Sequence, residues 1–118
     1  MHKPNEINIE QHDALFSMVI KGDITSFSET YLNQAYENLD SQHAPKKILL
    51  VFEKEAYINS GGIAVLIQIL ASTRKKGQLI GITGLNSHFK KIFNMVGITR
   101  FADIHNSVED AIKTMSSV

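Results

Sequence analysis

The sequence contains no cysteine, and this absence excludes disulfide bonds, a thiolate nucleophile and a cysteine-bound zinc site. Its net charge is zero, with 12 basic and 12 acidic residues in 118, whereas a general nucleic-acid binder is normally basic. The longest apolar run, residues 63–71, is interrupted by Gln68 and is too short to cross a bilayer. The polar N-terminal residues lack the apolar stretch of a signal peptide. These absences predict a cytoplasmic protein with no nucleic-acid partner and no membrane-inserted segment.

The sequence also lacks the common motifs of nucleotide-binding and hydrolytic sites. It has no P-loop and no G-x-G-x-x-G fingerprint. Ser60 does not lie in a G-x-S-x-G elbow, because Ile58 occupies the first glycine position. The five histidines show no H-x-x-x-H spacing, so no metal site is predicted, and no cofactor is implied. We therefore expect a binding protein rather than an enzyme.

The residues that are present are typical of one folded domain. With 43% hydrophobic and 20% charged residues, the composition is that of an ordinary globular protein. The length suits a single domain, and no repeat, low-complexity tract or linker divides the chain. The sequence therefore predicts one domain over residues 1–118, with its core at about residues 14–115.

Hydrophobic periodicity predicts five strands and four helices. The first two strands, with Ile7 and Ile9 in one and residues 14–20 in the other, are expected to form an antiparallel hairpin. Strands and helices then alternate to the end of the chain, which implies right-handed crossovers and a mostly parallel sheet. The predicted fold class is therefore α/β with a mixed sheet. The remaining strands are expected at 48–52, 79–82 and 100–104. The first helix is expected to begin at a capping box formed by Ser26 and Glu29, and the second to run from Ser60 to Lys76. Ser87 is expected to cap the third helix, which Gly97 ends, and the fourth is expected over 108–115.

Ser60 is the most notable residue at the predicted carboxyl edge of the sheet. Functional groups in open α/β sheets gather at this edge, at the strand ends and the helix starts that follow them. Gly61 and Gly62 leave the serine hydroxyl and the nearby backbone N–H groups uncrowded. Serine is also a preferred helix N-cap, worth about 1 kcal/mol. Ser60 is therefore interpreted as a helix cap, as a functional serine, or as both.

Three segments have an order and spacing that match one known protein family. Residues 57–64 read YINSGGIA and are similar to the family signature of two hydrophobic residues followed by D-S-[ST]-G-L-[GA]. Residues 20–24, IKGDI, follow the second strand as in the family. Residues 89–98 resemble the family's helix end, V-x-x-[LI]-[LF]-x-x-x-G-[LI]. Together these segments resemble the STAS domain family and in particular the bacterial anti-sigma-factor antagonists. The resemblance covers about residues 14–115 and implies a single STAS-like fold.

The resemblance implies a regulatory protein-binding domain. Antagonists of this family bind an anti-sigma factor that is also a serine kinase. The kinase phosphorylates the hydroxyl residue after the motif's aspartate, here Ser60, and a PP2C-type phosphatase reverses the reaction. Three positions depart from the motif: Asn59 replaces the aspartate, Gly61 replaces a second hydroxyl residue, and Thr25 replaces an acidic residue. The alternative is therefore a STAS interaction module without phosphorylation, in a signalling scaffold or a membrane-transporter complex.

The predicted partner surface surrounds the serine. On the helix after Ser60, Val65 and Ile69 lie beside the main apolar stripe. They belong either to a broad buried face under a neighbouring helix or to the surface for a partner or a weak homodimer. The full predicted surface comprises Asp23, Thr25, Tyr57, Asn59, Ser60, Gly61, Gly62, Val65, Ile69 and His88.

Zero net charge conceals a polarised chain. Residues 1–45 carry a net charge of −5, residues 46–100 one of +7, and residues 101–118 one of −2. In the predicted fold most of the basic residues lie at the edge opposite Ser60, and Lys54 is an exception. A phosphate on Ser60 is therefore expected to disrupt a contact rather than to dock into a basic pocket.

Overall fold

In the computed structural model, which describes residues 3–118, five strands form one sheet in the order β1-β2-β3-β4-β5. β1 pairs antiparallel with β2, and every other neighbouring pair is parallel. The predicted mixed, mostly parallel α/β sheet and its opening hairpin are thus confirmed. The strands are β1 (Glu6–His12), β2 (Leu15–Lys21), β3 (Lys47–Phe52), β4 (Leu79–Thr83) and β5 (Asp103–Ile104).

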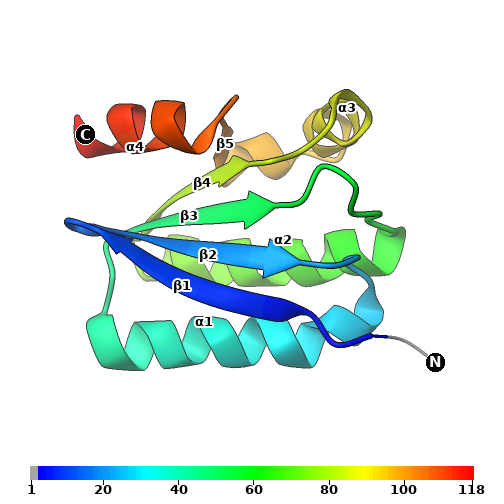
Figure 1. The fold of residues 1–118 in the computed structure, drawn as a ribbon, viewed down its shortest axis with the longest axis horizontal. Coiled ribbons are helices and arrows are strands. Elements are labelled where there is room, and N and C mark those ends of the chain that lie inside the picture. The colour runs from blue at the N-terminus through cyan, green and yellow to red at the C-terminus, as the bar shows by residue number, and fades with distance from the viewer. Residues whose placement is uncertain (1–2) are drawn as a thin grey trace.

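Helices lie on both faces of the sheet. Figure 1 shows α1 and α2 on one face, α4 on the other, and α3 past the carboxyl end of β4. Within residues 3–118, no helix combines the length and the apolar character that a membrane span requires. The helices are α1 (Glu29–His43), α2 (Ser60–Lys75), α3 (Ser87–Met95) and α4 (Val108–Ser116), with short 3-10 helices η1 (Ser26–Ser28) and η2 (Ile98–Arg100).

The central strand β3 is buried on both faces, as its continuous apolar run predicts. Ile48, Leu50 and Phe52 belong to the larger core cluster, which includes residues of α1, α2 and α3. Leu49 points to the other face and joins the smaller cluster that includes Met115 of α4. This packing holds the carboxyl end of β3, and the loop that follows it, in a fixed position relative to the helices.

The predicted start of the first helix and the predicted length of the last strand were wrong. The capping box lies one residue earlier than expected: the Thr25 hydroxyl accepts from the N–H of Phe27, and the Ser28 hydroxyl accepts from the N–H of Thr25. These short side chains satisfy the first N–H groups, so η1 precedes α1. The expected strand over 100–104 is shorter, because η2 follows Gly97 and leaves only β5, Asp103–Ile104, to pair with β4.

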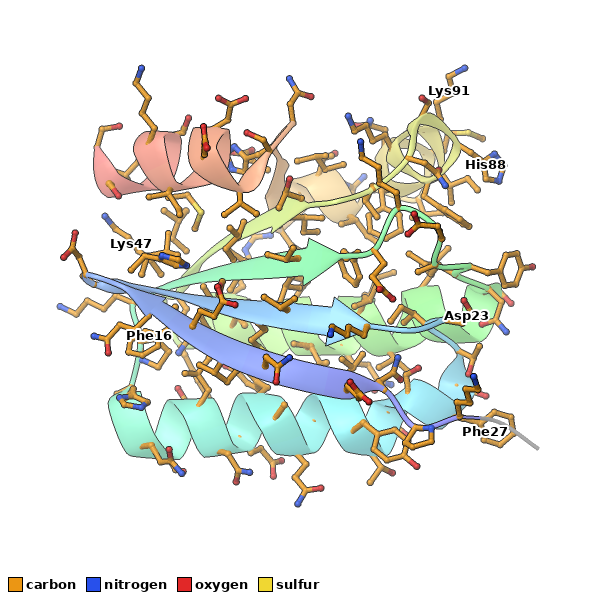
Figure 2. All side chains as sticks on the ribbon, viewed as in Figure 1. Phe16, Asp23, Phe27, Lys47, His88 and Lys91 are labelled. Carbon is orange, nitrogen blue, oxygen red and sulfur yellow. The ribbon has the colours of Figure 1, made fainter. Side chains whose placement is uncertain are left out.

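A polar cluster fixes the amino edge of the sheet, opposite the predicted site. The Tyr36 hydroxyl donates to Gln78 Oε1 over 2.6 Å, and Gln78 Nε2 donates to Asp40 Oδ1 over 2.8 Å. Lys76 Nζ lies 2.7 Å from Asp40 Oδ2, and this hydrogen bond lowers the pKa of the Asp40 carboxyl. Figure 2 shows another amino-edge cation, Lys47, at the end of the molecule opposite Asp23. The predicted separation of charge along the strands is therefore present at these positions.

Candidate functional site

Hydrogen bonds join the loops after β2 and β3 at the carboxyl edge of the sheet. Ile24 and Ile58 form a parallel bridge beyond the ends of the two strands. The Ile24 N–H donates to the Tyr57 carbonyl over 2.9 Å, and the Asn59 N–H donates to the Ile24 carbonyl over 3.2 Å. Asp23 Oδ1 accepts from the Tyr57 N–H over 2.9 Å. The Asp23 carboxylate is thus part of the structure that positions the loop before Ser60.

The two glycines after Ser60 let the first turn of α2 pack closely against the loop after β2. A Cβ atom at Gly62 would lie 2.1 Å from the Ile24 carbonyl oxygen, well inside van der Waals contact. A Cβ atom at Gly61 would lie 3.1 Å from Ser26 Cβ. The sequence predicted that these glycines leave the serine uncrowded. The structure shows a further reason for Gly62, which is direct contact between the helix and the Ile24 backbone.

Asn59, not Ser60, is the N-cap of α2. Its backbone is extended, with φ −93° and ψ 179°, and its Oδ1 accepts from the Gly62 N–H over 2.9 Å. Ser60 is the first helical residue and its side chain is exposed. The interpretation of Ser60 as the cap was therefore wrong. Asparagine and aspartate cap helices about equally well, so an aspartate at position 59 could accept the same hydrogen bond and would add a negative charge.

Removing the cap side chain is expected to cost stability at position 59 and not at position 60. Asn59→Ala deletes the acceptor for the Gly62 N–H and should lower the free energy of unfolding by about 1 kcal/mol. Asn59→Asp should retain the cap hydrogen bond and the stability. Ser60→Ala changes an exposed side chain, so its free energy of unfolding should stay within about 0.5 kcal/mol of that of the unmodified chain. Denaturation in urea measures all three. A larger loss of unfolding free energy for Ser60→Ala than for Asn59→Ala would indicate that Ser60, and not Asn59, caps α2.

The start of α3 forms the third part of this edge. Asn86 Oδ1 accepts from the Phe89 N–H over 2.9 Å, so Asn86 is the cap here and the prediction of Ser87 was wrong. Asn86 Nδ2 also donates to the Lys54 carbonyl over 3.0 Å, which connects α3 to the loop after β3. The position of His88, the second residue of α3, is therefore fixed relative to the loop that precedes Ser60.

Aromatic side chains connect α3 with that loop. The ring centroids of Tyr57 and Phe89 are 6.1 Å apart in an edge-to-face arrangement, and those of His88 and Phe89 are 5.0 Å apart. Tyr57 is 60% exposed and His88 is also exposed, whereas Phe89 is buried between them. Figure 2 shows His88 and Asp23 at the same end of the molecule. The carboxyl edge therefore carries an exposed tyrosine and an exposed histidine at the same end of the molecule as the exposed Ser60.

A family model described as the STAS domain matches residues 6–111. The chain belongs to the STAS family.

Solved structures with the same STAS fold include anti-sigma factor antagonists at low sequence identity. An antagonist from Mycobacterium paratuberculosis is 17% identical, with a TM-score of 0.76 over 93% of this chain and 92% of that one. RsbS of Moorella thermoacetica, carrying a serine-to-glutamate substitution, is 13% identical, with a TM-score of 0.78 over 94% and 95%. The Bacillus cell fate determinant SpoIIAA in its phosphorylated form is 12% identical, with a TM-score of 0.65 over 93% and 99%. At these identities the matches establish the STAS fold.

Val65 and Ile69 are not on the surface of this STAS domain. Each is 5% exposed and belongs to the larger core cluster. The interpretation as a broad buried face was right, and the assignment of these two side chains to a partner or dimer surface was wrong. Helix α2 presents Val65, Leu66, Ile69 and Leu70 to the core, so Ile63 and Ile67 are the half-buried residues at its flank.

The remaining predicted residues divide into exposed groups and groups with structural contacts. Tyr57, Ser60 and His88 are exposed at the carboxyl edge, and Asp23 is exposed while it accepts from the Tyr57 N–H. Thr25 caps η1, and Gly62 is buried against Ile24. The exposed members are therefore the residues of this set that a partner could contact without unfolding the edge.

Two residues at this edge were given no role by the sequence reasoning. Phe27 is 59% exposed in η1, next to Ser26, which borders Gly61. A single aromatic residue between Ser26 and Ser28 is a weak signal, because isolated exposed apolar residues are common. Glu53, the residue directly after β3, accepts at Oε1 from the Gly22 N–H over 2.8 Å. Its position directly after a buried strand was the available signal.

Proposed function

We propose that this STAS domain acts as an anti-sigma-factor antagonist: it binds an anti-sigma factor that is also a serine kinase, and phosphorylation of Ser60 ends the contact. A PP2C-type phosphatase then restores the unmodified form. One observation carries the proposal. Ser60 is the exposed first residue of α2, at the same edge as the exposed Tyr57 and His88.

The position of Ser60 makes its hydroxyl available for phosphorylation. Because Asn59 provides the cap, α2 does not need the serine oxygen. Within residues 3–118 the Ser60 hydroxyl makes no hydrogen bond, so a kinase would break none by taking it as the acceptor. SpoIIAA, which shares this fold, has also been solved in a phosphorylated form, and this supports phosphorylation of such a domain.

A phosphate at this position would change the surface more than the fold. It adds about −1.5 to −2 charges at pH 7, and a helix N-terminus favours negative charge. The folded domain should therefore accept the group. A partner that covers Tyr57 and Ser60 would have to desolvate that new charge, which weakens the complex. Lys54, in the preceding loop, is a cation that would oppose this effect if it bound the phosphate. We expect no such contact, so Lys54→Ala should leave the release by phosphate unchanged.

A second function is favoured by the neutral Asn59 beside Ser60. The family motif has a carboxylate at this position, and its absence removes a charged group next to the acceptor. An interaction module that is never phosphorylated, in a signalling scaffold or a transporter complex, would need no such group. The cap formed by Asn59 is retained in either function.

The test compares how well three variants recover a partner from the source cells. Ser60→Asp should reduce recovery at least tenfold (about 1.4 kcal/mol), whereas Ser60→Ala should recover the partner like the unmodified chain. Ser72→Asp, an exposed serine near the other end of α2, is the matched control and should have no effect. Incubation of the captured kinase with ATP should label every form except the two Ser60 variants. Equal recovery by all variants, with no label on Ser60, would support the module without phosphorylation.

A further inference from the structure

β1 is an edge strand that lacks several of the features that usually protect an edge, although Glu6 and Glu10 are exposed charged residues on it. It pairs with β2 only, and in Figure 1 no described element lies in front of it. Its pairing with β2 runs without a bulge from Glu6 opposite Lys21 to His12 opposite Leu15. The strand contains no proline and no lysine. Edges are commonly blocked by such residues, by bulges or by a covering element, so the outer backbone groups of β1 can accept another strand.

An uncharged groove runs between β1 and α1, beside this open edge. Its volume is about 530 Å³, and its lining includes Ile9 of the strand and Ala35 and Asn38 of the helix. Ile9 is 41% exposed. No lysine, arginine, aspartate or glutamate lines the groove, although 20% of the chain is charged. The cores of protein–protein interfaces are depleted of charged residues in the same way.

The sequence of β1 is complementary to itself in one antiparallel register. With a two-fold axis at Ile9, all seven residues of the strand find a partner. Ile9 then faces Ile9 of the second copy, and Ile7 faces Gln11. On the other face of the sheet, Glu6 lies opposite His12 and Asn8 lies opposite Glu10. The Ile9 pair is an apolar cross-strand pair, which stabilises a sheet, and no two acidic residues lie opposite each other in this register.

Neighbouring registers bring like charges together. An axis at Asn8 places Glu6 opposite Glu10 of the second copy. An axis at Glu10 places the two copies of Glu10 opposite each other. Like charges directly across a strand pair are destabilising. The charges of β1 thus select the axis at Ile9, which also gives the longest pairing.

We propose that two copies of this protein form a homodimer in which β1 pairs antiparallel with β1 of the second copy, with the two-fold axis at Ile9. The two five-stranded sheets then become one continuous sheet, and Ile9 and the uncharged grooves are covered at the interface. A second copy is favoured over an unrelated extended peptide because β1 can pair with itself over its whole length in this register, with Ile9 against Ile9 and no acidic residues opposed. This surface replaces the buried Val65 and Ile69 as the dimer surface. The dimer does not depend on the function proposed for Ser60.

Cysteine cross-linking tests the register, because the natural chain contains no cysteine. Residues directly opposite in an antiparallel pair have Cβ atoms about 4.5–5.5 Å apart, close enough for a disulfide after a small shift. Under mild oxidation Ile9→Cys should therefore form a covalent dimer. Gln11→Cys is the matched control on the same face of β1. Its two copies would lie about 13 Å apart along the strands and should not cross-link.

Sedimentation equilibrium tests the dimer without cross-linking. The unmodified chain should show a dimer in equilibrium with the 13.2 kDa monomer. Ile9→Lys should raise the dissociation constant about tenfold or more, because two lysines then face each other at the axis. Ile9→Thr should have a smaller effect, and circular dichroism should show that both variants fold. A monomer at every concentration, or equal cross-linking of Gln11→Cys and Ile9→Cys, would overturn the proposal. Binding of an extended partner peptide to a monomeric chain would overturn it as well.

Discussion

Gly62→Ala is expected to destabilise the domain by about 3 kcal/mol or more, although alanine is the better helix former. Alanine in place of glycine inside a helix normally gains about 0.5–1 kcal/mol. Here the new Cβ atom would lie 2.1 Å from the Ile24 carbonyl oxygen and 2.5 Å from its carbonyl carbon. Both atoms belong to the backbone, so no side-chain rotation can relieve the overlap. The first turn of α2, which carries Ser60, would have to move away from the loop after β2.

Gly61→Ala is the matched control for this prediction. It changes the neighbouring residue in the same helix, and its Cβ atom would meet Ser26 at 3.1 Å rather than overlap a carbonyl group. Its unfolding free energy should stay within about 1 kcal/mol of the unmodified chain, since the gain in helix propensity offsets the tight contact. Denaturation in urea measures both variants. If Gly62→Ala were as stable as Gly61→Ala, the close contact between α2 and Ile24 would not be important for the fold.

The order of the elements could be predicted from the sequence because it depends on local patterns. The apolar run in residues 48–52 indicates a strand buried on both faces, and Gly77 and Gly97 follow the ends of helices. Alternating strands and helices then imply a mostly parallel sheet. These patterns can be recognised without knowing which elements are in contact, so the fold class could be predicted from them.

The caps could not be assigned in the same way. Asn59 and Ser60, like Asn86 and Ser87, are adjacent residues that both suit an N-cap. The choice depends on where the backbone changes from extended to helical. For α2, Gly62 packs against the Ile24 backbone and Asn59 donates to the Ile24 carbonyl, and both contacts come from a distant loop. A tertiary contact thus determines that the serine becomes the exposed first helical residue.

The face of α2 that is buried also depends on the elements that pack against this helix. Apolar residues occupy so many positions from Ile63 to Leu70 that several faces of the helix could be buried. α2 packs against both the sheet and α1, which requires a wide apolar face, and Val65 and Ile69 lie on it. Periodicity alone cannot place a second helix beside the first. The prediction of a broad buried face and the prediction of a partner surface were therefore equally consistent with the pattern.

Phe93→Ala is expected to lower the free energy of unfolding by about 3–5 kcal/mol. The Phe93 side chain is fully buried, and its ring meets that of Phe52 edge to face with centroids 6.3 Å apart. Phe93 anchors α3 to the end of β3, and α3 carries His88 at the candidate site. The substitution should therefore loosen the edge that includes Tyr57 and Phe89 as well as reduce global stability. Denaturation in urea measures the loss, and hydrogen exchange of the α3 amides measures the local effect.

Met95→Ala, on the same helix, separates the loss of packing from any change in helix propensity. Met95 is 83% exposed, so its truncation should change the unfolding free energy by no more than about 0.5 kcal/mol. Faster exchange in α3 should then appear for Phe93→Ala and not for Met95→Ala. If Phe93→Ala unfolded the whole domain without first loosening α3, the helix would be part of the cooperative core. If both variants were as stable as the unmodified chain, α3 would be held by its cap and loop contacts, and the Phe52–Phe93 contact would not position the site.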